Sequence, residues 1–131
     1  MIVLDASALV DVVADQPTKD GVLARLDQPV AAPAHQLAEV LSALARLVRA
    51  GTITRGVARA AIDEATALEQ EHVVPTSAHL RRALALQDNV RVLDGLYVAL
   101  AEELDCALVT TDGRLARARA DCEIVLVEAS G

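Results

Sequence analysis

Aromatic side chains are almost absent from this sequence. Tyr97 is the single tyrosine, and the chain contains neither phenylalanine nor tryptophan. Protein modules that bind nucleic acid by stacking bases on aromatic rings need several such residues. The composition therefore excludes a base-stacking platform of the RRM or OB type.

Cysteine is scarce as well, with Cys106 and Cys122 as the only two. They do not form a Cys-x-x-Cys pair, and no histidine lies near either one, so the ligand spacing of a zinc site is lacking. Each cysteine lies directly before a predicted strand. We interpret both as reduced, buried thiols of a cytoplasmic protein, and the sequence does not determine whether they have a redox role.

Long uncharged apolar runs are also missing. We find no stretch of about 18 apolar residues, so we expect no membrane-spanning helix and no membrane partner. An apolar strand begins at Ile2, which leaves no room for an ordinary signal peptide. The chain has 131 residues, the usual size of one domain, and shows neither linker nor repeat. We therefore expect a single domain over residues 1–131.

Positive charge is in the minority, and the formal net charge is −7. The overall field of such a protein repels nucleic acid. A phosphodiester substrate would therefore require bound cations and local basic side chains. Lys19 is the only lysine among the 12 basic residues, and the arginines that make up the rest are the better phosphate ligands.

Hydrophobic residues are abundant, at 53% of the chain. Short apolar runs typical of strands alternate along the chain with segments in which apolar residues recur at helical spacing. Strands are expected at residues 2–4, 30–33, 72–75, 107–109 and 123–127. Helices are expected at residues 8–14, 20–26, 34–50, 55–71, 77–87, 94–104 and 114–120. This alternation predicts an α/β fold, with a five-stranded parallel sheet and helices on both faces.

Four of the 19 acidic residues differ from the rest by their position. Asp5 and Asp112 each follow a buried strand directly, Glu39 lies early in the helix after the second strand, and Asp94 begins a helix. The carboxyl ends of parallel strands and the amino ends of the following helices lie at one edge of a sheet. All four carboxylates are therefore expected on the same rim.

Each of these acids also has an ordinary structural explanation. Asp5, Asp94 and Asp112 could cap helices, and Glu39 could face water near the positive end of its helix. Capping does not explain why a carboxylate twice follows an apolar strand with hydroxyl side chains beside it. Clustered carboxylates repel one another, and divalent cations relieve this repulsion. Oxygen-only ligands suit Mg²⁺ or Mn²⁺, which can activate water for phosphodiester hydrolysis.

Several segments carry a resemblance to a known family. They are IVLDASA at residues 2–8, Glu39 in the third predicted helix, LDGLYVALA at residues 93–101 and LVTTD at residues 108–112. They occur in family order and span essentially the whole chain. The chain resembles the PIN-domain ribonucleases and, more closely, the VapC-type toxins of bacterial type II toxin–antitoxin pairs.

This resemblance implies a PIN-like fold with strand order 3-2-1-4-5 and a Mg²⁺- or Mn²⁺-dependent endoribonuclease. Asp5, Glu39, Asp94 and Asp112 would be the catalytic, metal-binding acids. Ser7 and Thr111 would be polar support around them. Some relatives carry a further acid a few residues beyond the last one, where this chain has Arg114 and apolar residues, so a second metal would be weakly held or depend on substrate phosphate.

The resemblance also implies partners: an RNA substrate, a second copy in a homodimer, and an antitoxin protein that docks in an apolar groove and blocks the site. Arg114 lies two residues from Asp112, which makes it a candidate RNA phosphate ligand. For the groove, the sequence offers apolar residues of the early helices and the third helix, which are Val10, Val13, Leu23, Leu26, Leu44 and Val48.

Two other functions fit parts of the pattern. A catalytically silent PIN-like module could act only as a binding or scaffold partner, although such a module has no use for four mutually repelling carboxylates. A receiver-like signalling domain also places acids at strand ends. That domain needs a lysine near the carboxyl terminus, whereas the only lysine here is Lys19.

Overall fold

The computed structural model describes residues 1–129 and contains the five-stranded sheet that the sequence predicts. Its strands are β1 (Ile2–Leu4), β2 (Val30–Pro33), β3 (Glu71–Val73), β4 (Ala107–Thr110) and β5 (Ile124–Leu126). All neighbouring strands are parallel. The order β3-β2-β1-β4-β5 confirms the predicted order 3-2-1-4-5.

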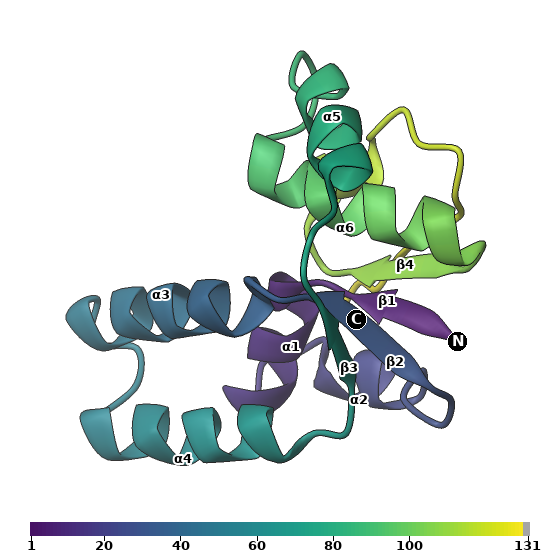
Figure 1. The fold of residues 1–131 in the computed structure, drawn as a ribbon. Helices are drawn as coiled ribbons and strands as arrows, with labels where there is room; N and C mark the ends of the chain where they lie inside the picture. Colours follow the sequence, from purple (N-terminus) through teal and green to yellow (C-terminus); the bar gives the residue numbers. More distant parts are fainter. Residues whose placement is uncertain (130–131) are drawn as a thin grey trace.

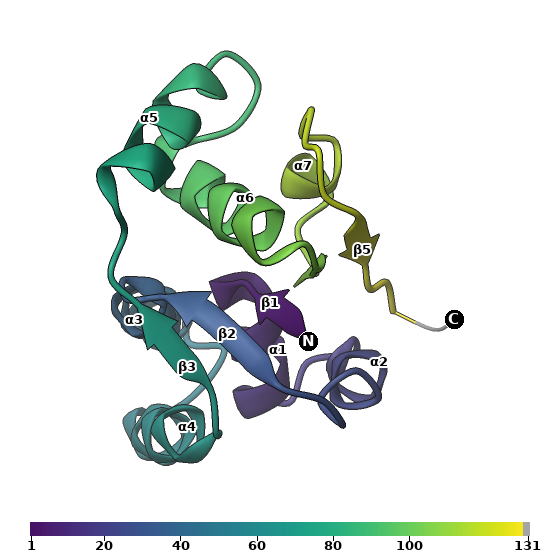
Figure 2. The same ribbon diagram turned by 45° about the vertical axis from the view of Figure 1, so that its right-hand side comes forward.

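Helices cover both faces of this sheet (Figures 1 and 2). They are α1 (Ala6–Val13), α2 (Lys19–Leu23), α3 (Gln36–Arg49), α4 (Arg55–Ala67), α5 (Ser77–Ala85), α6 (Val92–Leu104) and α7 (Gly113–Ala116). One apolar core joins the sheet to α1, α3 and α4. A second core joins the opposite face to α6 and α7.

The central strand β1 contributes to both cores. Ile2 and Leu4 belong to the core beneath α1 and α3, and Val3 belongs to the core beneath α6, because successive side chains of a strand point to opposite faces. Leu4 of β1 pairs with Val109 of β4. The carboxyl ends of these two strands therefore lie side by side, and so do the polar residues that follow them.

Several element boundaries differ from the prediction, and one difference concerns a site residue. Helix α6 begins at Val92 after Arg91 as its N-cap, so the prediction that Asp94 starts this helix is wrong, and Asp94 lies inside the first turn. Helix α1 begins at Ala6, directly after Asp5, whose side chain caps it.

The second half of the chain shows the other boundary differences. Helix α4 stops at Ala67, and β3 starts at Glu71 because that residue pairs with Ala31 of β2. Helix α7 is shorter than predicted and ends at Ala116. In the described part of the chain, none of the helices is long and apolar enough to cross a bilayer.

Candidate functional site

Asp5 lies at the centre of the rim, where β1 passes into α1. The residue is 3% exposed, and its carboxylate accepts hydrogen bonds from three donors. The Ala8 N–H donates to Oδ1 at 2.9 Å, and the Ser7 hydroxyl lies 2.8 and 2.9 Å from the two oxygens. The Thr110 hydroxyl donates to Oδ2 at 2.7 Å from the end of β4. These donors fix the orientation of a carboxylate that solvent barely reaches.

The same donors connect Asp5 to the turn after β4. Thr111 approaches the Ser7 hydroxyl with its own hydroxyl at 3.2 Å and its N–H at 3.3 Å. The Asp112 N–H donates to the Thr110 hydroxyl at 3.0 Å. The Asp112 carboxylate in turn accepts the N–H of Arg114 at 2.8 Å, as the N-cap of α7. The predicted supporting residues Ser7 and Thr111 therefore do contact this network.

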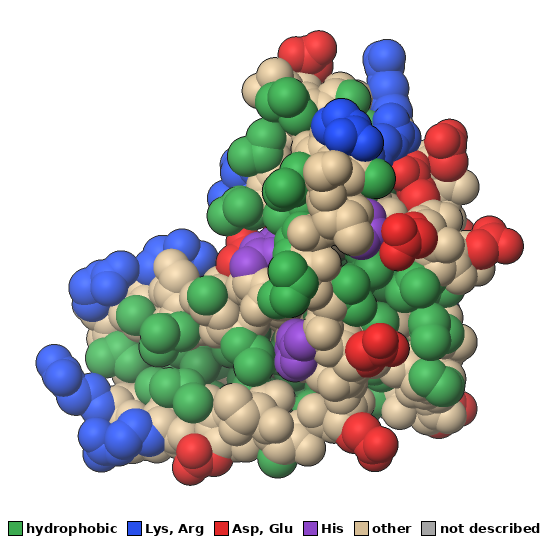
Figure 3. Space-filling model, in the orientation of Figure 1, with side chains coloured by type: hydrophobic (Ala, Val, Ile, Leu, Met, Phe, Trp, Pro, Cys, Tyr) green, Lys and Arg blue, Asp and Glu red, His purple; other side chains and the backbone are tan. Residues whose placement is uncertain are grey.

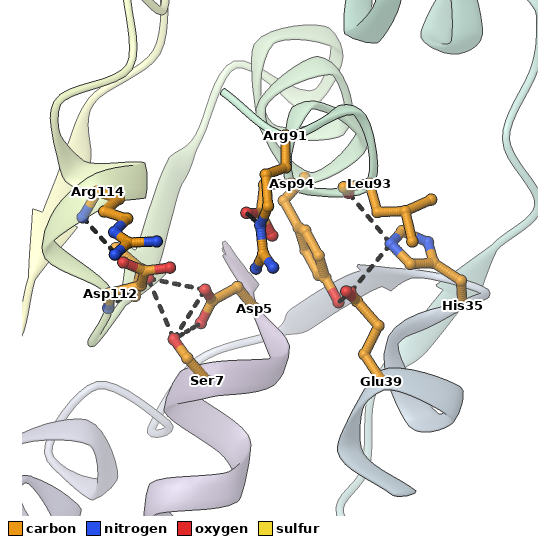
Figure 4. Close-up of polar contacts among 11 residues, drawn as sticks. Asp5, Ser7, His35, Glu39, Arg91, Leu93, Asp94, Asp112 and Arg114 are labelled. Carbon is orange, nitrogen blue, oxygen red and sulfur yellow. Dashed lines mark hydrogen bonds and ion pairs between the residues drawn. The ribbon is translucent and has the colours of Figure 1, made fainter. Parts of the chain in front are cut away.

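Asp94 reaches the site from the first turn of α6. Its carboxylate forms an ion pair with Arg91, and the distance from Nε to Oδ2 is 3.1 Å. The Asp94 side chain is 14% exposed, while that of Arg91 is 78% exposed. Figure 4 shows the guanidinium of Arg91 beside Asp94, between the side of the site that holds Asp5 and the side that holds Glu39.

Glu39 projects from the first turn of α3, and two groups hold it. The Tyr97 hydroxyl donates to its carboxylate at 2.7 Å. His35 Nε2 lies 3.2 Å from the same carboxylate and 3.2 Å from the Leu93 carbonyl oxygen. The His35 and Tyr97 rings are 5.1 Å apart. These contacts tie the start of α3 to the start of α6.

A buried glutamine connects α3 to β1 directly behind the site. The Gln36 side-chain amide donates to the Leu4 carbonyl at 3.0 Å, one residue before Asp5. Its carbonyl oxygen accepts the Gln70 amide at 2.7 Å and lies 3.0 Å from His72 Nε2. This arrangement holds the helix that carries Glu39 against the strand that carries Asp5.

Burial and mutual repulsion change the ionisation of the carboxylates. Burial raises the pKa of Asp5 to about 7, with an additional contribution from the charge of Asp94. Burial also raises the pKa of Asp94, and the charges of Glu39 and Asp112 raise it further against the opposing effect of Arg91. Burial acts in the same direction on Glu39, but hydrogen bonds from His35 and Tyr97 outweigh it and lower that pKa.

All four predicted acids line one cavity of about 580 Å³, together with Ser7. Asp112, Asp94 and Asp5 border the same open space in Figure 4, and Glu39 borders it from the side of α3. Arg114 lies outside this cavity and lines a neighbouring cavity of about 430 Å³, which shares Asp94 and Asp112. Within residues 1–129, no three acidic, histidine or cysteine side chains lie close enough together to hold a metal ion.

The structure also brings Thr110, Arg91 and Gln36 to the site, which the sequence pattern did not indicate. Thr110 could have been noticed as the one polar residue that ends an otherwise apolar strand. Arg91 could have been noticed because it precedes Asp94 by three positions, a spacing that allows an ion pair at a helix start. Gln36 gives no such signal, because its role depends on the contact between α3 and β1.

Three of the residues predicted for the apolar groove lie in the core instead, whereas Val48 does line a surface cavity. Val10, Val13 and Leu44 are buried in the core beneath the sheet, because α1 is enclosed between the sheet and the α3–α4 pair. The structure instead has a cavity of about 440 Å³ between α3 and α4. Its lining is Ala45, Val48, Arg49, Arg55, Ala58, Arg59 and Ile62. Figure 3 shows hydrophobic side chains between these helices and basic side chains at their outer ends.

Comparisons with known proteins agree with this architecture. The PIN domain family model matches residues 2–121. The chain is 45% identical over 124 residues to the Mycobacterium tuberculosis protein named Ribonuclease VapC3, covering 89% of this chain and 86% of that protein. Among solved structures, PAE2754 from Pyrobaculum aerophilum superposes with a TM-score of 0.71 at 22% identity, covering 94% of this chain and 81% of that one.

A second solved structure is VapBC2 from Rickettsia felis, bound to a DNA fragment from its promoter. It superposes with a TM-score of 0.69 at 14% identity and covers 98% of this chain and 100% of that one. The structural matches establish the fold, and the family model and the sequence relative establish the lineage. The chain therefore belongs to the PIN domain family and, within it, to the VapC group.

Proposed function

We propose that this protein is a Mg²⁺- or Mn²⁺-dependent endoribonuclease and the toxin of a toxin–antitoxin pair. The observation that carries the proposal is the convergence of Asp5, Glu39, Asp94 and Asp112 on one cavity at the carboxyl edge of the sheet. The ribonuclease name of its sequence relative supports the reaction class. The VapBC2 complex among its structural neighbours supports an antitoxin partner.

The residues of the cavity fit a divalent cation in kind. Asp5 is a buried carboxylate with a pKa raised to about 7, and Asp94 and Asp112 repel each other across the same space. A cation between them would offset both the burial of the Asp5 charge and the repulsion between Asp94 and Asp112. Carboxylate oxygens are the ligands that Mg²⁺ and Mn²⁺ prefer. Because Arg91 now pairs with Asp94, that ion pair must loosen before Asp94 can act as a ligand.

Asp5, Asp94, Asp112 and Glu39 are the residues that would hold the ion. When bound, it would supply Lewis-acid polarisation of a phosphoryl oxygen and a bound water of lowered pKa.

The chain's own groups orient this set. Ser7 and Thr110 donate to Asp5, and Tyr97 donates to Glu39. Arg91, released from Asp94, and Arg114 offer guanidinium groups to the phosphates of an RNA strand.

The groove between α3 and α4 is the proposed antitoxin site. Its floor is apolar and its rim carries Arg49, Arg55 and Arg59. A segment with an apolar face and flanking acidic residues would complement it. The helix α3 that forms one wall also carries Glu39, so an occupant extended along α3 would reach the catalytic cavity and block it.

A cleavage assay tests the proposed activity. The purified protein is incubated with structured RNAs in Mg²⁺, in Mn²⁺ or in EDTA, and the products are resolved on gels. We expect cleavage with either metal and none in EDTA. Asp94→Asn should lower the rate by roughly 100-fold or more, because it removes a charged ligand from the site. Asp63→Asn, on the exposed face of α4, is the matched control and should cleave normally.

Two outcomes would contradict the mechanism: cleavage that persists in EDTA, or full activity in Asp94→Asn. The competing function is that of a catalytically silent scaffold. The Arg91–Asp94 ion pair favours this function, because the Arg91 guanidinium occupies the centre of the site. Absence of cleavage with every metal and RNA, together with tight binding of an antitoxin, would favour that scaffold function.

A further inference from the structure

The two cysteines lie shortly before neighbouring strands: Cys106 directly precedes β4, and Cys122 lies in the bend two residues before β5. Strand β4 pairs in parallel with β5, with Leu108 opposite Ile124 and Val109 opposite Val125. The Leu108 N–H donates to the Glu123 carbonyl at 2.9 Å, so the pairing extends to the start of β5. If the chain continued in the same register before these strands begin, Cys106 would lie opposite Cys122.

Both cysteines also lie on the same face of the sheet. Side chains two positions apart on a strand share a face, and Leu108 and Ile124 belong to the core beneath α6. Cys106 and Cys122 pack against this same core, whereas Val109 and Val125 belong to the opposite one. Adjacent strands lie about 4.8 Å apart, within the Cα separation of about 4.4–6.8 Å that a disulfide needs.

The structure has both residues as free thiols of intermediate exposure. Burial raises the pKa of Cys106 and raises that of Cys122 to about 11, and the charge of a Cys106 thiolate contributes to the latter. A thiol with a raised pKa attacks slowly at neutral pH and is a poor leaving group during reduction. Such a pair exchanges slowly in both directions.

We propose that Cys106 and Cys122 form a reversible intramolecular disulfide when a low-molecular-weight disulfide oxidises the protein. The thiolate of one cysteine attacks a sulfur of the oxidant, which forms a mixed disulfide and releases one oxidant thiol. The second cysteine thiolate then attacks the mixed disulfide and displaces the other oxidant thiol. Two protein thiols are oxidised to one disulfide, and one oxidant disulfide is reduced to two thiols.

This disulfide would enclose residues 107–121. The enclosed segment contains β4, the turn with Thr110 and Asp112, and all of α7. Closing the loop lowers the entropy of the unfolded chain. The oxidised protein should therefore unfold at a temperature higher by about 10 °C, and the link would fasten the edge strand β5 to the strand that carries the Asp112 turn.

Mass spectrometry under non-reducing conditions tests the inference. The intact protein is equilibrated with oxidised glutathione, and its mass and tryptic peptides are measured before and after treatment with dithiothreitol. The expected product is lighter by about 2 Da, contains a peptide that joins Cys106 to Cys122, and returns to the starting mass on reduction. Thermal unfolding of the oxidised and reduced forms should show the difference in melting temperature.

The single variants Cys106→Ser and Cys122→Ser are the controls. Each lacks the second thiol, so the remaining cysteine should keep a glutathione adduct of about 305 Da instead of losing mass. Two results for the unmodified protein would overturn the inference: both thiols remaining free at equilibrium, or glutathione adducts and intermolecular dimers as the only products. Neither result depends on whether the protein cleaves RNA.

Discussion

Asp5 has an ionisable carboxyl group that is almost completely buried. Its neighbours only partly offset the free-energy cost of removing the ionised carboxylate from water. Hydrogen bonds from the three donors Ser7, Ala8 and Thr110 favour the ionised form. Burial disfavours that form more strongly, so the pKa rises from 3.8 to about 7. A carboxylate in this situation is stabilised by a cation, and without one it lowers the stability of the fold at neutral pH.

We expect this cost to appear as a pH dependence of stability in EDTA. Asp5 is protonated in both states below pH 4, but between about pH 4 and pH 7 only the folded state keeps the proton. The folded protein therefore binds more protons across this window, and its free energy of unfolding falls as the pH rises. The contribution of Asp5 amounts to a loss on the order of 4 kcal/mol.

Urea unfolding at several pH values between 4 and 8 measures this effect. Asp5→Asn serves as the reference because it cannot titrate and should lack this component of the pH dependence. As the pH rises, the free energy of unfolding of the unmodified protein should fall relative to that of Asp5→Asn. This change should level off above pH 7. A difference that does not change with pH would show that Asp5 titrates normally in the folded protein.

At the scale of elements, the contact between α5 and α6 fixes the position of Asp94. Gly95 of α6 packs against α5, and a Cβ atom at that position would lie 3.0 Å from the Ala83 Cα and 3.1 Å from the Ala83 Cβ. Backbone and a short side chain have little freedom to move aside. The absence of a side chain at Gly95 therefore allows the two helices to approach closely beside the site.

Gly95→Ala should consequently destabilise the protein, by about 1–3 kcal/mol, because the added methyl group forces the helices apart. Gly56→Ala is a matched control on α4, where the added Cβ would find only the Thr54 hydroxyl, 3.9 Å away. That change should be neutral or stabilise by up to about 1 kcal/mol, since alanine is the better helix former. Chemical unfolding of both variants measures the effect, and equal free energies of unfolding would refute the close-packing argument.

At the scale of the whole molecule, exposed apolar side chains indicate surfaces for partners. Leu80 and Leu84 lie one turn apart on α5 and are 53% and 57% exposed, and Val92 and Leu93 at the start of α6 are 45% and 50% exposed. Surfaces of this kind commonly mark protein interfaces. We therefore propose this face of α5 and α6 for the homodimer, and the groove between α3 and α4 for the antitoxin.

Leu84→Glu tests the homodimer, because a buried, unpaired carboxylate would disrupt an apolar interface. Light scattering coupled to size-exclusion chromatography should find a dimer for the unmodified protein and a monomer for this variant. Val57→Glu makes the same change on the exposed surface of α4 and should leave the dimer intact. A monomeric unmodified protein, or a variant that remains dimeric, would argue against this interface.

Much of the fold could be predicted because it depends on local patterns. The apolar run at Ile2–Leu4 is buried on both faces, as its lack of alternation indicates. Gly51 ends α3 with a positive φ of 75°, and Thr54 caps α4 through the Val57 N–H. Some element boundaries were predicted wrongly, such as the start of α6. These boundaries depend on packing against other elements rather than on the residues at the helix end.

The sequence by itself determined the order of strands and helices, and therefore the edge at which the four carboxylates gather, because every parallel strand ends on the same side of a sheet. Only the tertiary structure decided what each carboxylate contacts. The pairing of Asp5 with Thr110 depends on the register of β1 and β4, and that of Glu39 with Tyr97 depends on the approach of α3 to α6. Such contacts join residues distant in the chain, whose separation no local pattern can specify.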